Sequence, residues 1–208
     1  MRVLIGTTNP AKIREHRALL GDLPIELVTL DQVGTPPEVE ENGPTFAENA
    51  LIKARAYAAW SGLATLADDG GLAIDALNGE PGVRSKRWID GRESSDEQLI
   101  AYTLERLRGL PIGQRGAAMK IAVALVTPSP GPWPSSARQR GHEIVGEGEI
   151  RGYVPVEASP RRDPGFPFRS VFKVAGLDKY YLDLTPEEHE RFNHRRQAVE
   201  PIRAFLSG

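Results

Sequence analysis

Short apolar runs alternate with longer amphipathic segments along most of this chain, and the alternation limits the folds open to it. Strands are predicted at residues 2–8, 25–30, 117–128 and 141–154, and two short strand-like pieces at 63–67 and 72–77 flank a predicted turn at 68–71. Helices are predicted at residues 9–20, 45–62, 94–110 and, as shorter pieces, 185–206. Helices that alternate with strands indicate an α/β fold, and the adjacent hairpin-like strands of the second half indicate a mixed sheet. We therefore expect a mixed β-sheet flanked by helices.

The length of the chain favours one domain. Its 208 residues, of which 40% are hydrophobic, can bury one substantial core, so a single domain over residues 1–208 is expected. The Pro- and Ser-rich segment at residues 128–140, between the last two predicted strands, is interpreted as a mobile loop or hairpin tip without a function of its own.

Charge and cysteine content exclude several classes of protein. The 26 basic and 28 acidic residues give a net charge of -2, so no overall positive field favours a nucleic-acid polymer or an anionic membrane. The absence of cysteine excludes disulfides and thiolate metal sites. No stretch approaches the ~20 apolar residues of a membrane span, and the N-terminal apolar run is too short for a signal peptide. We expect a soluble, cytoplasmic protein that binds anions through local arrangements of residues.

The segment TTNPAK, residues 7–12, directly follows the first predicted strand. Asn9 is a suitable helix N-cap, and Pro10 suits the first turn. The unpaired amides and the dipole at such a helix start favour an anion, so Thr7, Asn9 and Lys12 would face a phosphate. Alternatively, Asn-Pro only begins a helix and Lys12 is solvated.

The helix predicted at residues 45–62 begins with a second polar motif. Thr45 and Glu48 have the T-x-x-E spacing of a capping box, so Glu48 is interpreted as a helix cap rather than a catalyst. Asn49 and Lys53 are four residues apart and share a face that can present an amide and an ammonium to one ligand. The acidic loop that contains Glu41 is either solvated or supplies a hard oxygen ligand for magnesium.

Residues 63–77, LATLADDGGLAIDAL, place two aspartates and two glycines between short apolar runs, and a turn is predicted there. Neighbouring side chains of extended backbone point to opposite faces, so Asp68 and Asp69 should have different roles. Gly70 and Gly71 allow positive φ or the close approach of a ligand. Magnesium-dependent hydrolysis of a phosphoanhydride needs a carboxylate on the metal, a base for water and cations on the phosphates. The matching residue types are present at Lys12, Glu41, Lys53 and Asp69. A purely structural turn is the alternative.

Two C-terminal segments contain residues suited to a purine base. Phe166 or Phe168, in PGFPFRSVF, can stack on a base, and His194 and Arg195, in EEHERFNHRR, can donate to a carbonyl and a ring nitrogen. The alternative interpretation places the phenylalanines in the core and the basic residues on a solvated helix face.

Taken in order, these motifs resemble the inosine triphosphate pyrophosphatase family, the deaminated-purine nucleoside triphosphate diphosphatases. The family pattern S/T-x-N-x-x-K is matched by Thr7, Asn9 and Lys12. An acidic residue before T-F-x-E-N-A-x-x-K-A is matched by EENGPTFAENALIKA. The pattern A-D-D-S-G-L-x-V-D-A-L-x-G-x-P-G-x-x-S is matched by ADDGGLAIDALNGEPGVRS, with Gly70 in place of Ser. The resemblance covers essentially the whole chain and is strongest up to about residue 88.

The resemblance implies an elongated mixed sheet in two lobes with a nucleotide cleft between them, and commonly a homodimer. It implies Mg²⁺-dependent cleavage of a nucleoside triphosphate, such as ITP, dITP or XTP, to the monophosphate and pyrophosphate as nucleotide-pool cleansing. By position, Glu41 and Asp69 would bind the metal, and Asp69 would also activate water. Thr7 to Lys12 would bind phosphates, with Lys53 assisting, and Asp68 would shape and polarise the metal site. The residues assigned to substrate are Thr7, Thr8, Asn9, Lys12, Gly70, Phe166, Phe168, Arg169, His189, His194 and Arg195.

The departures from the family pattern lie in the predicted base-recognition segments. Where the family has G-F-G-Y-D-P-x-F, this chain has GFPFRSVF, which puts Arg169 at an acidic position. Where the family has E-K-N-x-x-S-H-R, this chain has EHERFNHR, with His189 in place of Lys and Asn193 in place of Ser. These changes alter the charge available to a base or phosphate. We expect hydrolysis with an altered base preference. The alternatives are a nucleotide-binding sensor or scaffold with weak turnover, and a hydrolase of pyrimidine or modified nucleotides.

Overall fold

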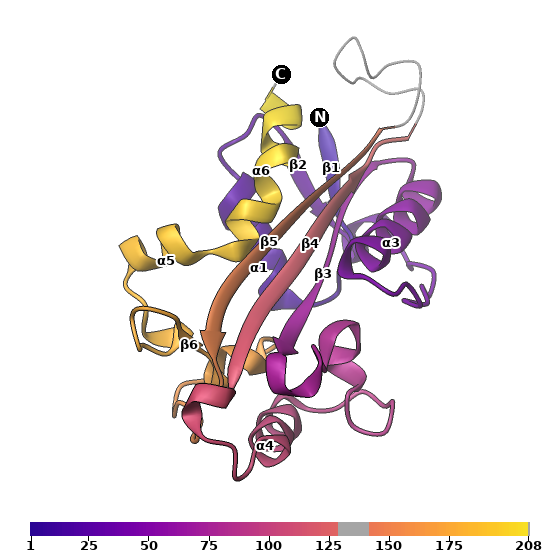
Figure 1. The fold of residues 1–208 in the computed structure, drawn as a ribbon. Helices are drawn as coiled ribbons and strands as arrows, with labels where there is room; N and C mark the ends of the chain where they lie inside the picture. The colour runs from indigo at the N-terminus through magenta and orange to yellow at the C-terminus, as the bar shows by residue number, and fades with distance from the viewer. Residues whose placement is uncertain (129–141, 208) are drawn as a thin grey trace. The chain divides into compact units, whose positions relative to one another are not determined.

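The computed structural model describes residues 1–128 and 142–207, and within them the strands form a six-stranded sheet in the order β2-β1-β3-β4-β5-β6 (Figure 1). The strands are β1 Arg2–Ile5, β2 Glu26–Thr29, β3 Ala64–Ile74, β4 Gly116–Val126, β5 Glu143–Tyr153 and β6 Lys173–Val174. The α-helices are α1 Pro10–Leu20, α2 Leu30–Val33, α3 Phe46–Ser61, α4 Asp96–Arg106, α5 Pro186–Phe192 and α6 His194–Ser207. Short 3₁₀ helices are η1 Asp75–Leu77, η2 Gly82–Arg87, η3 Ile112–Gln114, η4 Pro167–Val171 and η5 Tyr181–Asp183. The loop predicted at residues 128–140 lies, apart from Pro128, outside the described residues.

The predicted mixed sheet with flanking helices is confirmed. Strand β1 pairs in parallel with both β2 and β3, whereas β5 and β6 are antiparallel. Parallel neighbours need a crossover connection, and α1 provides it between β1 and β2.

The strand β3 differs from the sequence prediction. A turn is predicted at residues 68–71, but the strand runs without interruption from Ala64 to Ile74, so that prediction is wrong. Asp and Gly have poor strand propensity, and tertiary contacts override it here. Gly71 leaves room for Ser85, because a Cβ at Gly71 would lie 1.9 Å from Ser85 Oγ. The same hydroxyl accepts a hydrogen bond from the Leu72 amide at 3.3 Å, which anchors the strand beyond the glycines.

The chain divides into two compact units. Unit 1 comprises Met1–Asp69, Ile121–Gly148 and Arg195–Gly208, and unit 2 comprises Gly70–Lys120 and Glu149–His194. The single domain over residues 1–208 and the nucleotide cleft between lobes stay predictions.

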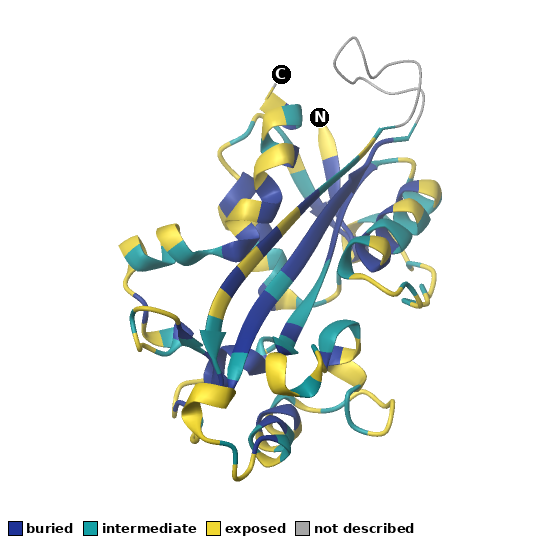
Figure 2. Cartoon of the chain, in the orientation of Figure 1, coloured by how far each residue is buried: buried dark blue, intermediate teal, exposed yellow. Residues whose placement is uncertain are grey.

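In unit 1, alternate side chains of β3 enter two different hydrophobic clusters. Leu66 packs with residues of α1 and α6, whereas Ala67 packs with the alanines of α3. The first cluster includes Val3, Leu20, Leu66, Val123 and Ile202, and the second includes Ala50, Ala54, Ala58, Ala67 and Ala122. Strand β4 alternates in the same way and is buried along most of its length (Figure 2). Since residues two apart share a face of a strand, Asp68 lies on the α1 and α6 face and Asp69 on the α3 face.

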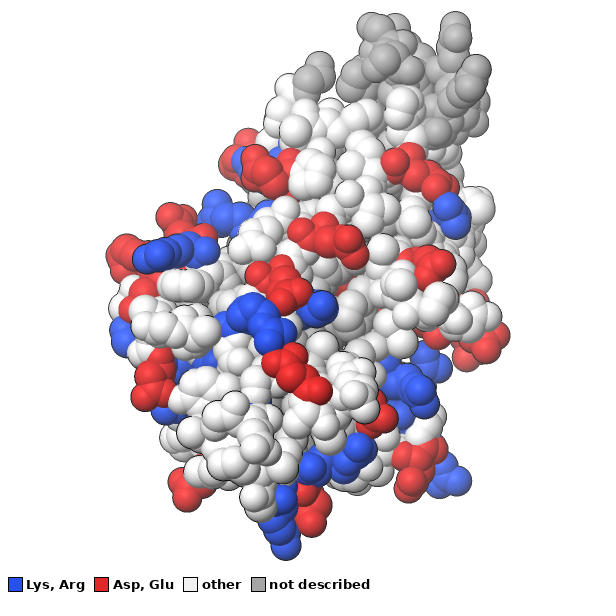
Figure 3. Space-filling model, viewed as in Figure 1, with Lys and Arg blue, Asp and Glu red and all other residues white. Residues whose placement is uncertain are grey.

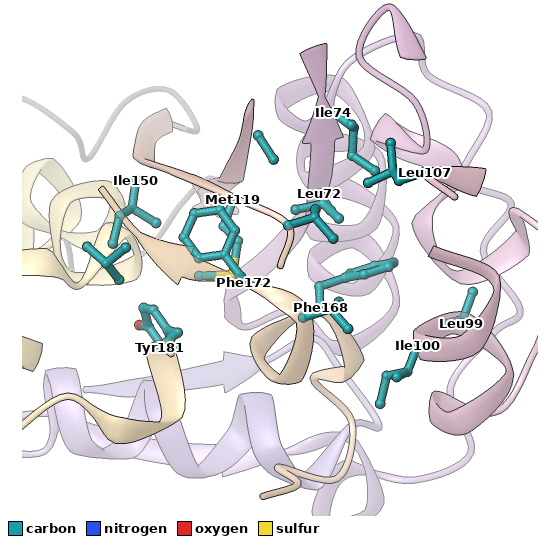
Figure 4. Packing of buried hydrophobic residues seen from close by; sticks show 14 of the residues in the cluster. Leu72, Ile74, Leu99, Ile100, Leu107, Met119, Ile150, Phe168, Phe172 and Tyr181 are labelled. Atoms are coloured by element: carbon teal, nitrogen blue, oxygen red, sulfur yellow. The ribbon is translucent and has the colours of Figure 1, made fainter. Parts of the chain in front are cut away.

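In unit 2, the core packs α4 against parts of β3, β4 and β5 (Figure 4). Leu99 and Ile100 of α4 contribute to it, together with Phe172 and the ring of Tyr181. The core therefore includes the segment around η4, which the sequence links to base recognition.

None of the helices in the described residues is both long enough and apolar enough to cross a membrane. On the face shown in Figure 3, acidic and basic side chains are interspersed, in keeping with the small net charge.

Candidate active site

Residues 7–9 connect β1 to α1 and cap that helix. Asn9 Oδ1 accepts a hydrogen bond from the Ala11 amide at 2.9 Å, and the Asn9 amide donates to Thr7 Oγ1 at 3.2 Å. Pro10 occupies the first helical position, so the predicted N-cap is confirmed. Thr8 is exposed. Phosphate binding by Thr7, Thr8 and Asn9 stays a prediction, which the positive end of the α1 dipole favours.

The start of α3 is capped as predicted. The Glu48 amide donates to Thr45 Oγ1 at 3.2 Å, and the Thr45 hydroxyl donates to Glu48 Oε2 at 2.8 Å. Thr45 is therefore confirmed as the N-cap, and the Glu48 carboxylate contacts the Thr45 hydroxyl. Helix α3 ends, also as predicted, at Gly62 in the left-handed conformation, with φ of 68°. These caps fix the position of the next residues on the helix.

Asn49 and Lys53 lie one turn apart on α3 and contact the two carboxylates predicted to bind metal. Asn49 Nδ2 donates to Asp69 Oδ2 at 3.2 Å, and Lys53 Nζ lies 2.5 Å from Glu41 Oε2. Asn49 is buried, and so is most of Lys53. The helix therefore brings an amide to one carboxylate and an ammonium to the other.

The environment of Asp69 suits a proton acceptor. Burial raises the pKa of the Asp69 carboxyl, and the charge of Glu41 raises it further. Lys53 and Lys12 act in the opposite direction without cancelling the effect of burial on this pKa. A carboxylate whose pKa is shifted towards neutrality is a stronger base than an ordinary aspartate, as general-base catalysis requires.

Asp68 lies on the opposite face of the strand, as the alternation predicts, and is only 1% exposed. Lys12 Nζ lies 3.0 Å from Asp68 Oδ2, and the Arg195 guanidinium lies 2.9 Å from the same oxygen. His16 Nε2 lies 3.0 Å from Asp68 Oδ1. Three basic side chains, from α1 and α6, thus surround one buried carboxylate.

The protonation states within this cluster follow from the burial and the charges. Burial alone would raise the pKa of Asp68, but Arg195 and Lys12 hold that pKa well below its usual value. Burial lowers the pKa of His16 and also that of Lys12. Because an ionised Asp68 only accepts hydrogen bonds, its 3.0 Å contact requires the proton of a neutral His16 on Nε2, so Arg195 Nη1, 3.4 Å from that nitrogen, makes no hydrogen bond to it.

Arg195 also contacts Glu15, whose Oε2 lies 2.7 Å from the Arg195 Nε atom. Lys12 and Arg195 are balanced by Asp68 and Glu15, so with a neutral His16 the formal charges of the cluster sum to zero. Arg195 is 3% exposed. The contact of Arg195 with a base stays a prediction, and the structure gives this side chain an internal role that the sequence does not suggest.

The remaining predicted residues lie in unit 2 or at its edge. The Arg169 guanidinium donates to Asp163 Oδ2 at 2.7 Å and lies over the Phe166 ring, 3.8 Å from its centroid. Phe168 is 9% exposed within the hydrophobic core, which favours the core interpretation over base stacking. Gly70 is half-buried in β3.

Two of the residues predicted to bind substrate, His189 and His194, pack edge-on against one tyrosine. Their rings lie 5.0 Å and 6.0 Å from the centroid of the Tyr181 ring. His194 is buried and His189 is half-buried. Substrate contacts by Gly70, Phe166, Phe168, Arg169, His189 and His194 stay predictions.

Glu41 and Asp69 supply the hard oxygens that Mg²⁺ prefers. Within residues 1–128 and 142–207, no group of three or more His, Cys, Asp or Glu side chains is placed to hold a metal ion. Two carboxylates fit a magnesium ion that takes its other ligands from phosphate oxygens and water. The donor set therefore fits a metal ion that completes its coordination with water or with nucleotide phosphates.

The sequence prediction missed three residues that contact predicted site residues, namely His16, Glu15 and Asp163. His16 lies four residues after Lys12, so the helical period places both on one face of α1, and this spacing was an available signal. Asp163 carries no comparable signal, because it lies in irregular chain before η4, which contains its partner Arg169.

Comparison with known proteins supports one family. The model of the Ham1 family matches residues 3–205. The dITP/XTP pyrophosphatase of Frankia alni is 41% identical, over 99% of this chain and 97% of that protein. The dITP/XTP pyrophosphatase of Bacillus subtilis is 34% identical, over 98% of this chain and 96% of that protein.

Two solved structures share the fold over nearly the full chain. A HAM1 protein from Coxiella burnetii has a TM-score of 0.80 and 32% identity, and the alignment covers 99% of this chain and 98% of that one. The dITP/XTP pyrophosphatase of Mycobacterium abscessus has a TM-score of 0.73 and 38% identity, with 97% of each chain covered.

Proposed function

The chain belongs to the Ham1 family, and on that premise we propose that it hydrolyses deaminated purine nucleoside triphosphates, such as dITP and XTP, to monophosphate and pyrophosphate. Relatives named dITP/XTP pyrophosphatase, 34% to 41% identical over nearly the whole chain, carry this proposal. The activity would remove deaminated nucleotides from the nucleotide pool.

We assign Asp69 as the base that activates the water molecule, which attacks the α-phosphorus of the nucleotide. The Asp69 carboxylate accepts a proton from the water as the new oxygen–phosphorus bond forms and the bond between the α- and β-phosphates breaks. The leaving pyrophosphate carries the electron pair of the broken bond. The burial that raises the pKa of Asp69 supports this assignment, because it strengthens the carboxylate as a base.

Glu41 and Asp69 would hold Mg²⁺, and the bound ion would offset negative charge on the phosphate oxygens. Lys53 and Lys12 would add positive charge beside those phosphates. In the structure, Lys53 pairs with Glu41 and Lys12 pairs with Asp68. Both ammonium groups are therefore oriented by ion pairs before a phosphate binds. An oriented cation loses less conformational entropy when a phosphate binds.

The proposal is tested by measuring pyrophosphate release with Mg²⁺ from dITP, XTP, ITP and the ordinary nucleotides. Release from the deaminated purines, and its loss when EDTA removes the metal, is the expected result. If no nucleotide in the panel yields pyrophosphate, the proposed function fails.

The base preference, the assembly and the compartment are further parts of the proposal. Arg169 pairs with Asp163 and stacks on Phe166, so a positive group occupies a position that is acidic in the family pattern, which supports an altered preference. Ratios of kcat/KM across the nucleotide panel measure it. We also propose a cytoplasmic homodimer, which analytical ultracentrifugation and cell fractionation test.

A further inference from the structure

Helix α3 holds the loop that contains Glu41 at two points. Lys53 pairs with Glu41, and one turn earlier Asn49 Oδ1 accepts a hydrogen bond from the Gly43 amide at 2.8 Å. The same Asn49 side chain donates to Asp69 Oδ2. One buried amide therefore connects the loop of one predicted metal ligand to the carboxylate of the other.

The orientation of the Asn49 amide is fixed by its partners. The Gly43 amide can only donate, so the atom that faces it must be the oxygen Oδ1. The NH₂ group then faces the Asp69 carboxylate. A flipped amide would set donor against donor and acceptor against acceptor, so these contacts admit one orientation.

The loop approaches Asn49 too closely for a side chain at position 43. A Cβ at Gly43 would lie 2.9 Å from Asn49 Oδ1 and 2.8 Å from Glu48 Cβ. Asn49 is itself only 2% exposed, and its backbone amide donates to Thr45 O at 3.1 Å in the first turn of α3. The connection is thus tightly packed from the helix to the loop.

We propose that Asn49 is a positioning residue for the hydrolytic reaction. It fixes the rotation of the Asp69 carboxylate and holds the Glu41 loop beside it, without touching the nucleotide. This inference rests on the proposed function, because it assigns a role within the same site. The residue is distinct from the predicted metal ligands, and an amide that is used within the protein is a poor candidate for a substrate contact.

Two substitutions separate the two hydrogen bonds. Asn49→Asp keeps the size of the side chain and an acceptor for the Gly43 amide, but it cannot donate to an ionised Asp69. Asn49→Leu removes both contacts. Asn78→Asp, which adds the same charge at an exposed residue of unit 2, is the matched control.

The readouts are kcat, KM, Mn²⁺ affinity without nucleotide, and hydrogen exchange at the Gly43 amide. For Asn49→Asp we expect kcat to fall about tenfold or more, as for other groups that orient a metal ligand, with little change in KM. Gly43 exchange should stay near that of the wild type in Asn49→Asp and accelerate about tenfold in Asn49→Leu. Asn49→Leu should also bind Mn²⁺ about tenfold more weakly.

A kcat for Asn49→Asp within about twofold of the wild type would overturn the proposal, and so would unchanged Gly43 exchange in Asn49→Leu. If the Asn49→Leu variant does not fold, the kcat of Asn49→Asp alone decides whether the proposal holds. If the wild type hydrolyses no nucleotide, the proposed function fails, whereas Gly43 exchange and Mn²⁺ affinity still decide the role of Asn49.

Discussion

Replacing Asp68 with Asn tests whether the buried charge cluster supports unit 1. The substitution preserves shape and removes one charge from a side chain that is 1% exposed. Lys12 and Arg195 would then face a neutral amide, and Glu15 would balance only one of them. The cluster would change from a formal charge of zero to one uncompensated positive charge, with its three basic side chains still buried around position 68.

Removal of one partner from a buried ion pair destabilises proteins by about 3–5 kcal/mol, because the remaining charge stays desolvated. For a chain of this size, each 1 kcal/mol lowers Tm by about 2–4 °C, so we expect Asp68→Asn to melt about 6–20 °C lower. The folded state holds the pKa of Asp68 well below its ordinary value. Its contribution to stability is therefore present above the unfolded pKa of about 3.9 and is lost as pH falls through the lower folded pKa.

Urea denaturation followed by circular dichroism, at several pH values between 5 and 8, measures this effect. The difference in free energy of unfolding between wild type and Asp68→Asn should be constant between about pH 7 and 8 and should grow as the pH falls below about 6.5, because Asp68 raises the pKa of the buried His16 and its loss makes that residue harder to protonate. Asp22→Asn is the control, because Asp22 forms an exposed pair with Arg203, and it should change stability much less. A loss below about 1 kcal/mol for Asp68→Asn would refute the reasoning, since such a value is typical of exposed pairs.

Two further substitutions test the buried histidine and the packing of β3. The folded state lowers the pKa of His16, so the unfolded chain binds more protons, and the wild type should lose stability relative to His16→Gln as pH falls from about 6.5 to about 5. If urea denaturation showed the same pH dependence of the free energy of unfolding for wild type and His16→Gln, this expectation would be contradicted. Gly71→Ala places a Cβ 1.9 Å from Ser85 Oγ, so calorimetry should show a loss of about 1–3 kcal/mol. Gly113→Ala, with nothing within 4 Å, should stay within about 0.5 kcal/mol of the wild type, and equal losses for the two would contradict the packing account.

Local sequence rules predicted the parts of the site that depend on nearby residues. The cap at Asn9 and the capping pair of Thr45 and Glu48 are contacts over two or three residues, so residue type and spacing determine them. The opposite faces of Asp68 and Asp69 follow from the alternation of an extended strand. The α/β class and the mixed sheet were predictable for the same reason.

Long-range contacts account for the errors and omissions. Asp68 and Arg195 are far apart in the sequence and meet because α1 and α6 cover the same face of the sheet in unit 1. No local pattern shows that pairing. The turn predicted at residues 68–71 is wrong for a related reason. The glycine at position 71 makes room for Ser85, which comes from a different segment, and does not mark a change of chain direction.

Pyrophosphate release by the wild type and by Asp69→Asn tests the central claim most directly. With Mg²⁺, the wild type should cleave dITP or XTP, and Asp69→Asn should lose about 10²–10⁴-fold in kcat while its circular dichroism spectrum is unchanged, because the variant lacks the proposed base. Turnover by Asp69→Asn at the rate of the wild type, or no pyrophosphate from the wild type, would contradict the account.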